Sequence, residues 1–256
     1  MEQAAMQRMA QATWLLAALA LSGCVQMTAP APMPIPQPVP QAARGELPVL
    51  SPQEAARNFV TVVTRVEPVA EALCRARTNG QADCDLQIVI DKRMELPPNA
   101  FQTLDEAGRP VVGFTLALIA DARNADELAF VLGHEAAHHI AGHIPRQKQT
   151  AAAGAVLGAV LGQVTGADAA MQDQLQNIGA SVGARRYSRD FELEADALGA
   201  EIAFHAGYDP VLGAGFFARL PDPGDQFLGS HPPNAQRQAQ VAAVVARLKQ
   251  QTGTGW

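Results

Sequence analysis

A stretch of apolar residues between Asn124 and Pro145 constrains the fold of this 256-residue chain more than any other segment. Asn124 can cap a helix, with Glu127 three positions further on, and the apolar side chains that follow recur every three or four residues. This spacing is typical of a helix with one buried face. Proline cannot continue a helix, so we expect this helix to begin after Asn124 and to be ended by Pro145.

The same helix carries His134, Glu135 and His138 in the order His-Glu-Ala-Ala-His. Positions four apart differ by about 40° around an α-helix, so the two imidazoles face the same way and can bind one metal ion. Glu135 is turned by about 100° from His134, which brings its carboxylate beside the metal, where it can deprotonate a metal-bound water. The motif therefore predicts a catalytic centre with one Zn²⁺ per chain.

A catalytic zinc ion takes three protein ligands and keeps one position for water, so a third ligand must come from another segment. Glu192 and Asp196 are four residues apart on a second expected helix, from near Ser188 to His205, and they share one face of it. Glu194 is rotated by about 200° from Glu192 and cannot reach the same point. We expect Glu192 to bind the metal and Asp196 to hydrogen-bond the far nitrogen of a ligand histidine.

Two other histidines, His139 and His143, lie close to the motif. His143 is nine residues after His134, which turns it to the opposite face of a continuous helix. We therefore expect His139 and His143 to be surface or packing residues. The alternatives to a catalytic centre are a solvated acidic face around Glu192 and a structural zinc site, but structural sites are usually closed by four ligands.

A helical His-Glu-x-x-His, a later Glu-x-x-x-Asp helix and a Ser-His-Pro further on resemble the HtpX-like and CAAX-prenyl-protease-type family of zinc peptidases. The match covers most of residues 51–250, and the family's pattern falls on these positions of the sequence: His134, Glu135, His138, Glu192, Asp196, His231 and Arg237. The resemblance implies a gluzincin-type zinc endopeptidase that hydrolyses peptide bonds with a water activated by Glu135. The chain lacks the transmembrane helices of the integral-membrane members and is similar to their soluble, periplasmic lipoprotein branch.

His231 lies in the segment Ser230-His231-Pro232-Pro233 and is a candidate catalytic residue. Its imidazole can stabilise the oxyanion of the tetrahedral intermediate, or it can occupy the open zinc position until substrate arrives. A purely structural histidine is the third reading, and the sequence leaves all three open.

The N-terminal residues indicate export and a lipid anchor. Arg8 precedes an apolar run from Trp14 to Leu21 that is too short to span a bilayer and is typical of a secretory signal. The run ends in Leu21-Ser22-Gly23-Cys24, which resembles the lipobox of bacterial lipoproteins; a buried helix with an incidental cysteine is the alternative. We expect residues 1–23 to be a signal peptide, Cys24 to be diacylated, and the anchor to lie on the periplasmic face of the outer membrane.

Proline occupies every second position from Pro30 to Pro40, which favours an extended linker over residues 24–50. The remaining cysteines, Cys74 and Cys84, are an even pair in a chain expected to enter an oxidising compartment, so we expect a disulfide between them. Closing a loop of about ten residues stabilises the folded state by roughly 2–3 kcal/mol.

Residues 51–256 are expected to form one α+β domain of the zincin type, mainly helical, with a small antiparallel or mixed sheet beside the helix of the His-Glu-x-x-His motif. Ser51 and Glu54 form a capping-box pattern at its start, and a last helix is expected from Ala235 to Leu248. The strands are expected at Leu86–Ile90 and Pro110–Leu116. We expect the second of these strands to bind the substrate backbone as an added strand.

One segment has a pattern unlike the predicted helices and strands, because Gly154, Gly158, Gly162 and Gly166 recur every fourth residue. On a helix they would line one groove for close helix contact, as small residues do in membranes. The apolar part is too short to cross a bilayer. We expect a loosely packed helix or a mobile loop near the active site, with contact to a membrane surface or a partner as the alternative.

The charge and composition limit the partners. The chain has a formal net charge of −6 with 17% charged residues, and it has no basic footprint for DNA or RNA. We expect polypeptide substrates, a membrane reached through the lipid, possible envelope assembly partners and no nucleic acid. The resemblance and the location imply quality control of misfolded or assembling envelope proteins. The alternative function is a metal-binding chaperone or assembly factor for envelope proteins with a gated or inactive protease site.

Overall fold

A computed structural model describes residues 48–219 and 234–253 of the chain. The chain divides into two units, Met1–Val39 and Pro40–Trp256, and all described residues belong to the second unit. The expected signal peptide, Cys24, most of the proline-rich linker and His231 lie outside the described residues.

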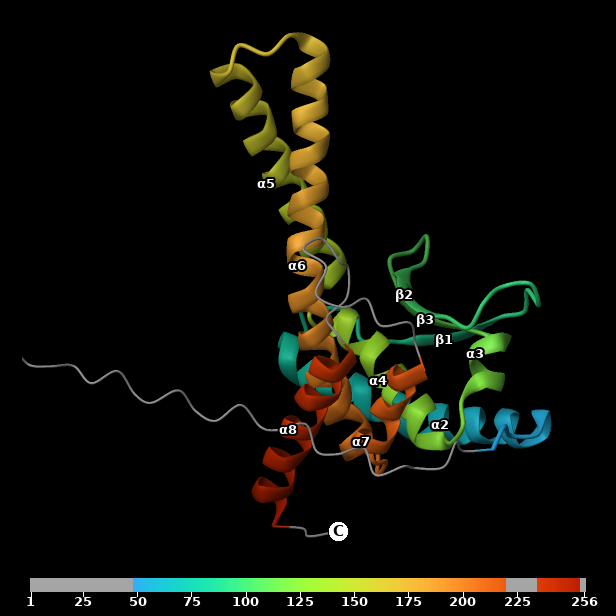
Figure 1. The fold of residues 1–256 in the computed structure, drawn as a ribbon. Helices are drawn as coiled ribbons and strands as arrows, with labels where there is room; N and C mark the ends of the chain where they lie inside the picture. The colour runs from blue at the N-terminus through green and yellow to red at the C-terminus, as the bar shows by residue number, and fades with distance from the viewer. Residues whose placement is uncertain (1–47, 220–233, 254–256) are drawn as a thin grey trace, which may run out of the picture. The chain divides into compact units, whose positions relative to one another are not determined.

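The second unit is mainly helical and carries one small sheet, which confirms the predicted α+β class (Figure 1). Its helices are α2 (Pro52–Thr78), α3 (Leu116–Asp121), α4 (Ala125–Ile140), α5 (His143–Val164), α6 (Ala169–His205), α7 (Pro210–Gly213), the 3-10 helix η1 (Ala214–Arg219) and α8 (Asn234–Thr252). The sheet contains β1 (Gln87–Asp91), β2 (Ala100–Leu104) and β3 (Pro110–Thr115) and lies beside α4.

The sheet is mixed, with the strand order β1-β3-β2. β3 runs parallel to β1, with Val89 opposite Gly113, and antiparallel to β2, with Phe101 opposite the same glycine. The prediction that β3 binds the substrate backbone is wrong, because both of its edges are already paired. Of the two outer strands, β2 is the one that contacts α4. Its existence was not predicted from the sequence.

Helix α2 begins as predicted and supplies one side of the core. The backbone amide of Glu54 donates to Ser51 Oγ over 3.3 Å, and the backbone amide of Ser51 donates to Glu54 Oε2 over 3.0 Å, which is a complete capping box. On its buried face, Phe59 meets Phe114 of β3 edge to face, with 5.2 Å between the ring centroids. Near its end, Cys74 forms a disulfide with Cys84.

Helix α4 begins after Asn124, whose side chain accepts a hydrogen bond of 2.9 Å from the amide of Glu127. The prediction that Pro145 ends it is wrong. The helix ends at Ile140, and Gly142 then adopts the left-handed conformation with φ of 64°. Pro145 lies instead in the first turn of α5, where a backbone N–H has no partner within the helix. The direction of the chain therefore changes at Gly142, and His143 is the first residue of a new helix.

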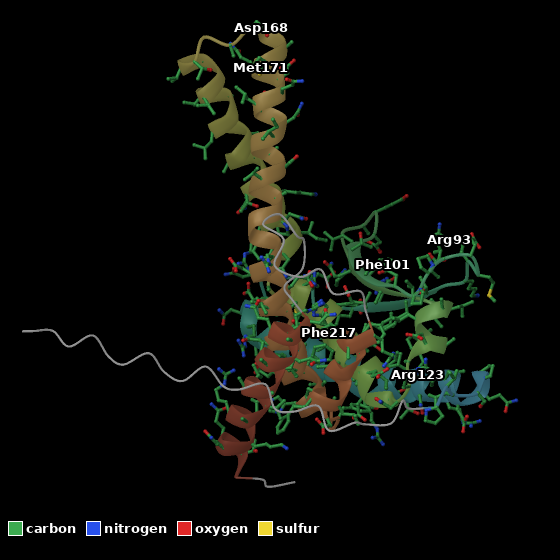
Figure 2. The ribbon with its side chains drawn as sticks, viewed as in Figure 1. Arg93, Phe101, Arg123, Asp168, Met171 and Phe217 are labelled. Atoms are coloured by element: carbon green, nitrogen blue, oxygen red, sulfur yellow. A yellow bond between two sulfur atoms is a disulfide. The ribbon has the colours of Figure 1, made fainter. Side chains whose placement is uncertain are left out.

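Helix α6 is much longer than predicted, because it begins at Ala169 rather than near Ser188. Asp168 caps it by accepting a hydrogen bond of 2.9 Å from the amide of Met171, and Figure 2 labels both residues at the end of α6 farthest from α4. The helix ends at His205, as the sequence predicted, and Gly207 follows in the left-handed region.

Gly154, Gly158 and Gly162 form the contact between α5 and α6, which lie side by side in Figure 1. Gly166 follows the end of α5, and nothing lies within 4 Å of an added Cβ there. A Cβ at Gly154 would collide with the carbonyl oxygen of Gly179, and one at Gly158 would collide with that of Leu175. The expectation of a loosely packed helix or a mobile loop is therefore wrong. Within the described residues, no helix is both long enough and apolar enough to span a bilayer.

Candidate metal centre

The centre lies where α4 crosses α6, and two glycines let the helix backbones approach closely. A Cβ at Gly133 would lie 2.7 Å from the carbonyl oxygen of Gly199, and a Cβ at Gly199 would lie 2.6 Å from the backbone nitrogen of His134. No side chain larger than hydrogen fits between the two helices at this point. Because His134 directly follows Gly133, the crossing also sets the distance between the motif of α4 and the acidic residues of α6.

Three side chains from these helices converge on one point: His134, His138 and Glu192. One ligand atom from each lies within 4.8 Å of the others. The Nε2 atoms of the two histidines are 3.0 Å apart, and the Glu192 carboxylate oxygens lie 3.5 Å from His134 Nε2 and 3.6 Å from His138 Nε2. Two imidazole nitrogens and one carboxylate oxygen are the donor set of many catalytic zinc sites, so these residues fit the metal.

Asp196, one turn after Glu192 on α6, contacts the nitrogen of His134 that faces away from the metal position. Its Oδ1 lies 2.9 Å from His134 Nδ1, and the carboxylate is fully buried. A hydrogen bond from Nδ1–H fixes the tautomer that presents the Nε2 lone pair to the metal position. The geometry is the one that the spacing of Glu192 and Asp196 predicted.

Arg237, from α8, neutralises this buried carboxylate. Its Nε donates to Asp196 Oδ2 over 2.8 Å, and its Nη2 donates to Oδ1 over 2.7 Å. The guanidinium stacks on the ring of Phe217, 3.7 Å from the centroid, and Nη2 lies 3.4 Å from Glu192 Oε2. In the sequence Arg237 was only part of a family resemblance. Its contacts with Asp196 and Glu192 depend on the packing of α8 against α6, which no local pattern encodes.

The prediction that His143 is a surface or packing residue is confirmed for packing, but the prediction that it faces away from the motif is wrong. Its side chain is buried, and its Nδ1 lies 2.7 Å from His138 Nδ1. Its Nε2 lies 3.1 Å from Glu194 Oε2. On one continuous helix His143 would face away from His134, whereas the break at Gly142 turns it back towards His138. His139 is a packing residue, with its Nε2 at 2.6 Å from the carbonyl oxygen of Asp83.

Burial and neighbouring charges give the two ligand histidines very different pKa values in the metal-free protein. Burial alone would lower the pKa of His134, but the carboxylates of Asp196 and Glu192 outweigh it and raise the pKa to about 10. Burial and the positive charge of His134 lower the pKa of His138 to about 3. Without a metal, a proton on His134 is therefore stabilised between two carboxylates. Metal binding has to displace this proton.

Glu135 lines a cavity of about 200 Å³ together with Gln102 of β2, His138 and Glu192. Burial raises the pKa of the Glu135 carboxyl group, and the positive charge of His134 opposes this rise. Gln147 of α5 and Phe191 of α6 also line the cavity. The cavity therefore joins the metal-binding side chains, an adjacent carboxylate and an outer strand of the sheet.

The fold and the converging donor set define a helical metallopeptidase domain with its motif on α4 and its third carboxylate on α6. The sequence model of Peptidase family M48 matches residues 63–245, and the chain belongs to this family, as the resemblance predicted. A search of curated proteins gave no match to the chain.

Proposed function

We propose that the protein is a zinc endopeptidase that hydrolyses peptide bonds with a water activated by Glu135. One observation carries the proposal: two imidazoles from α4 and one carboxylate from α6 offer three ligand atoms within 4.8 Å of one another, and Glu135 lines the cavity beside them. Three protein ligands leave one position open, as in catalytic sites, whereas structural sites are closed by four.

The groups of the site have separate roles in the proposed hydrolysis. A bound zinc ion supplies a Lewis acid that polarises the scissile carbonyl and makes water more acidic. Glu135 accepts the proton of the attacking water and returns it to the leaving amine. His231, the expected oxyanion donor or gate, lies outside the described residues.

The substrate backbone is proposed to add to β2 rather than to β3. The strand β2 is an outer strand of the sheet among the described strands, and its residue Gln102 lines the same cavity as Glu135. A peptide that pairs with β2 would be held mainly by backbone hydrogen bonds, which gives loose side-chain specificity. Such binding suits misfolded or assembling proteins as substrates.

The proposed location is the periplasmic face of the bacterial outer membrane. A diacylated Cys24 would anchor the chain, and the linker of residues 24–50 would hold the protease domain, residues 51–256, away from the bilayer. The disulfide between Cys74 and Cys84 supports an oxidising compartment. The proposed partners are the polypeptide substrates, the membrane and envelope assembly factors.

The proposal is tested with Glu135→Gln in the mature protein, using an unfolded protein such as casein as substrate. Removing the general base is expected to lower kcat by about 10²–10⁴-fold, while zinc content stays that of the parent. Glu106→Gln, at an exposed position, is the matched control and should cleave like the parent. A chelator should abolish cleavage by the parent, and added zinc should restore it.

Two results would overturn the proposal. Cleavage by Glu135→Gln at the parent's rate and in the presence of chelator would rule out the metal-dependent mechanism. A zinc-loaded parent that prevents aggregation of unfolded clients but cleaves none of them would favour the chaperone alternative.

A further inference from the structure

A chain of hydrogen bonds leads from the metal-binding residue His138 towards the surface. His138 Nδ1 lies 2.7 Å from His143 Nδ1. On its other side, His143 Nε2 lies 3.1 Å from Glu194 Oε2, and Arg146 Nη1 donates to the same carboxylate oxygen over 2.7 Å. The chain joins α4 to the first turn of α5 and to α6.

Only one placement of protons satisfies every contact in this chain when a metal is bound. If His138 offers Nε2 to the metal, its Nδ1 carries the hydrogen and donates to His143 Nδ1. His143 must then carry its own hydrogen on Nε2, where it donates to the Glu194 carboxylate. Arg146 keeps that carboxylate charged and oriented.

The position of His143 is fixed by packing as well as by hydrogen bonds. The residue is 4% exposed, and its ring stacks on Phe191 with 4.5 Å between centroids and 11° between planes. The Arg146 guanidinium also contacts the Phe191 ring, with its central carbon 4.4 Å from the ring centroid. The imidazole of His143 therefore presents Nδ1 to His138 in one preset orientation.

We propose that His143 is a positioning residue, which holds His138 in the tautomer and orientation that bind the metal, and that Glu194 in turn holds His143. The proposal rests on the proposed metal centre and deepens it. Both ligand histidines are then oriented by a carboxylate. Asp196 contacts His134 directly, and Glu194 acts on His138 through the buried His143. The start of α5 thereby becomes part of the centre.

The test compares zinc affinities of the mature protein, measured by competition with a chromophoric chelator. His143→Leu removes the acceptor and is expected to weaken zinc binding by about 10–100-fold. His143→Asn keeps an oxygen near the position of Nδ1 and should recover most of that loss. His139→Leu, at the neighbouring histidine that contacts Asp83, is the matched control and should bind zinc like the parent.

The melting temperature of the metal-free variants separates positioning from a merely structural role. A structural role would lower that temperature in both His143 variants and leave the zinc affinity of the folded protein unchanged, which would overturn the proposal. If His143→Leu does not fold, Glu194→Leu takes its place, because its side chain is 46% exposed. This variant should weaken zinc binding by about tenfold, and an unchanged affinity would overturn the proposal.

The tautomers give a second readout that is independent of affinity and of peptidase activity. Long-range ¹H–¹⁵N spectra of the zinc-loaded parent should show His138 protonated on Nδ1 and His143 protonated on Nε2. A proton on His143 Nδ1 would break the hydrogen bond from His138 and overturn the proposal. Because neither readout requires cleavage, failure of this proposal and failure of the proposed protease function are distinguishable.

Discussion

The carboxylate of Asp196 is fully buried and is held by three contacts, two from Arg237 and one from His134. Burial would raise the pKa of this group, but these neighbours outweigh it and lower the pKa below its ordinary value. The charge is therefore kept, and it acts on the ligand histidine. A neutral side chain of the same shape cannot do this, because an amide has only one acceptor oxygen for donors on both sides.

Asp196→Asn tests this role directly. Its amide nitrogen must face a donor, either Arg237 or His134, and the hydrogen bond that fixes the His134 tautomer is weakened or lost. Zinc affinity is expected to fall by about 10–100-fold, measured by chelator competition. Asp190→Asn, at an exposed position of the same helix, is the control and should leave the affinity unchanged. An unchanged affinity in Asp196→Asn would show that the carboxylate only fills space.

Among the site residues, the sequence predicted those pairs that lie on one face of a single helix. His134 and His138 share a face of α4, and Glu192 and Asp196 share a face of α6, because spacing within a helix fixes direction. The predicted direction of His143 is wrong, because that direction depends on the break at Gly142. Glu194 points away from the metal position and towards His143, as its rotation from Glu192 predicts.

The distance between α4 and α6 is set at the point where their backbones come closest. Gly133 and Gly199 allow α4 and α6 to cross with almost no space between them, and His134 lies at this crossing. A side chain at either glycine would meet backbone atoms, which cannot rotate away. The distance between the metal-binding histidines and Glu192 therefore depends on two residues that bind nothing.

Gly199→Ala is expected to push α4 and α6 apart, because its Cβ would lie 2.6 Å from the backbone nitrogen of His134. The strain should cost about 1–3 kcal/mol of the free energy of unfolding, measured in urea, and zinc affinity should fall with it. Gly215→Ala is the matched control, since nothing lies within 4 Å of the added Cβ. Parent-like stability and zinc binding in Gly199→Ala would contradict the role assigned to the crossing.

The starts of α2 and α4 and the end of α6 were predicted from the sequence, whereas the start of α6 and the end of α4 were not. Asn124 and Ser51 are the caps that the sequence indicated, because a cap acts on its own first turn. The first half of α6 was missed because α5 and α6 meet through glycines rather than through a stripe of large apolar residues. The strand β2 was missed because its pattern is short and depends on pairing with β3.

In the described unit, α4 is the central helix: it packs against both α2 and α6, and α8 packs against α6. The metal centre is built from α4, α5, α6 and α8, whereas the disulfide joins Cys74 of α2 to Cys84, just before β1. Near His138, His139 Nε2 lies 2.6 Å from the carbonyl oxygen of Asp83, the residue before Cys84. Global stability and the geometry of the centre are therefore expected to respond differently to loss of the disulfide.

Replacing both cysteines, in the variant Cys74→Ala with Cys84→Ala, separates these two properties. The open loop gains freedom mainly in the unfolded chain, so the free energy of unfolding should fall by roughly 2–3 kcal/mol in urea. Zinc affinity of the folded protein should stay within about threefold of the parent, because no ligand or its partner lies in the loop. The parent treated with a mild reductant is the control and should match the double variant in stability. A large loss of zinc affinity at parent-like stability would mean that the loop acts on the centre through His139, and it would contradict this separation.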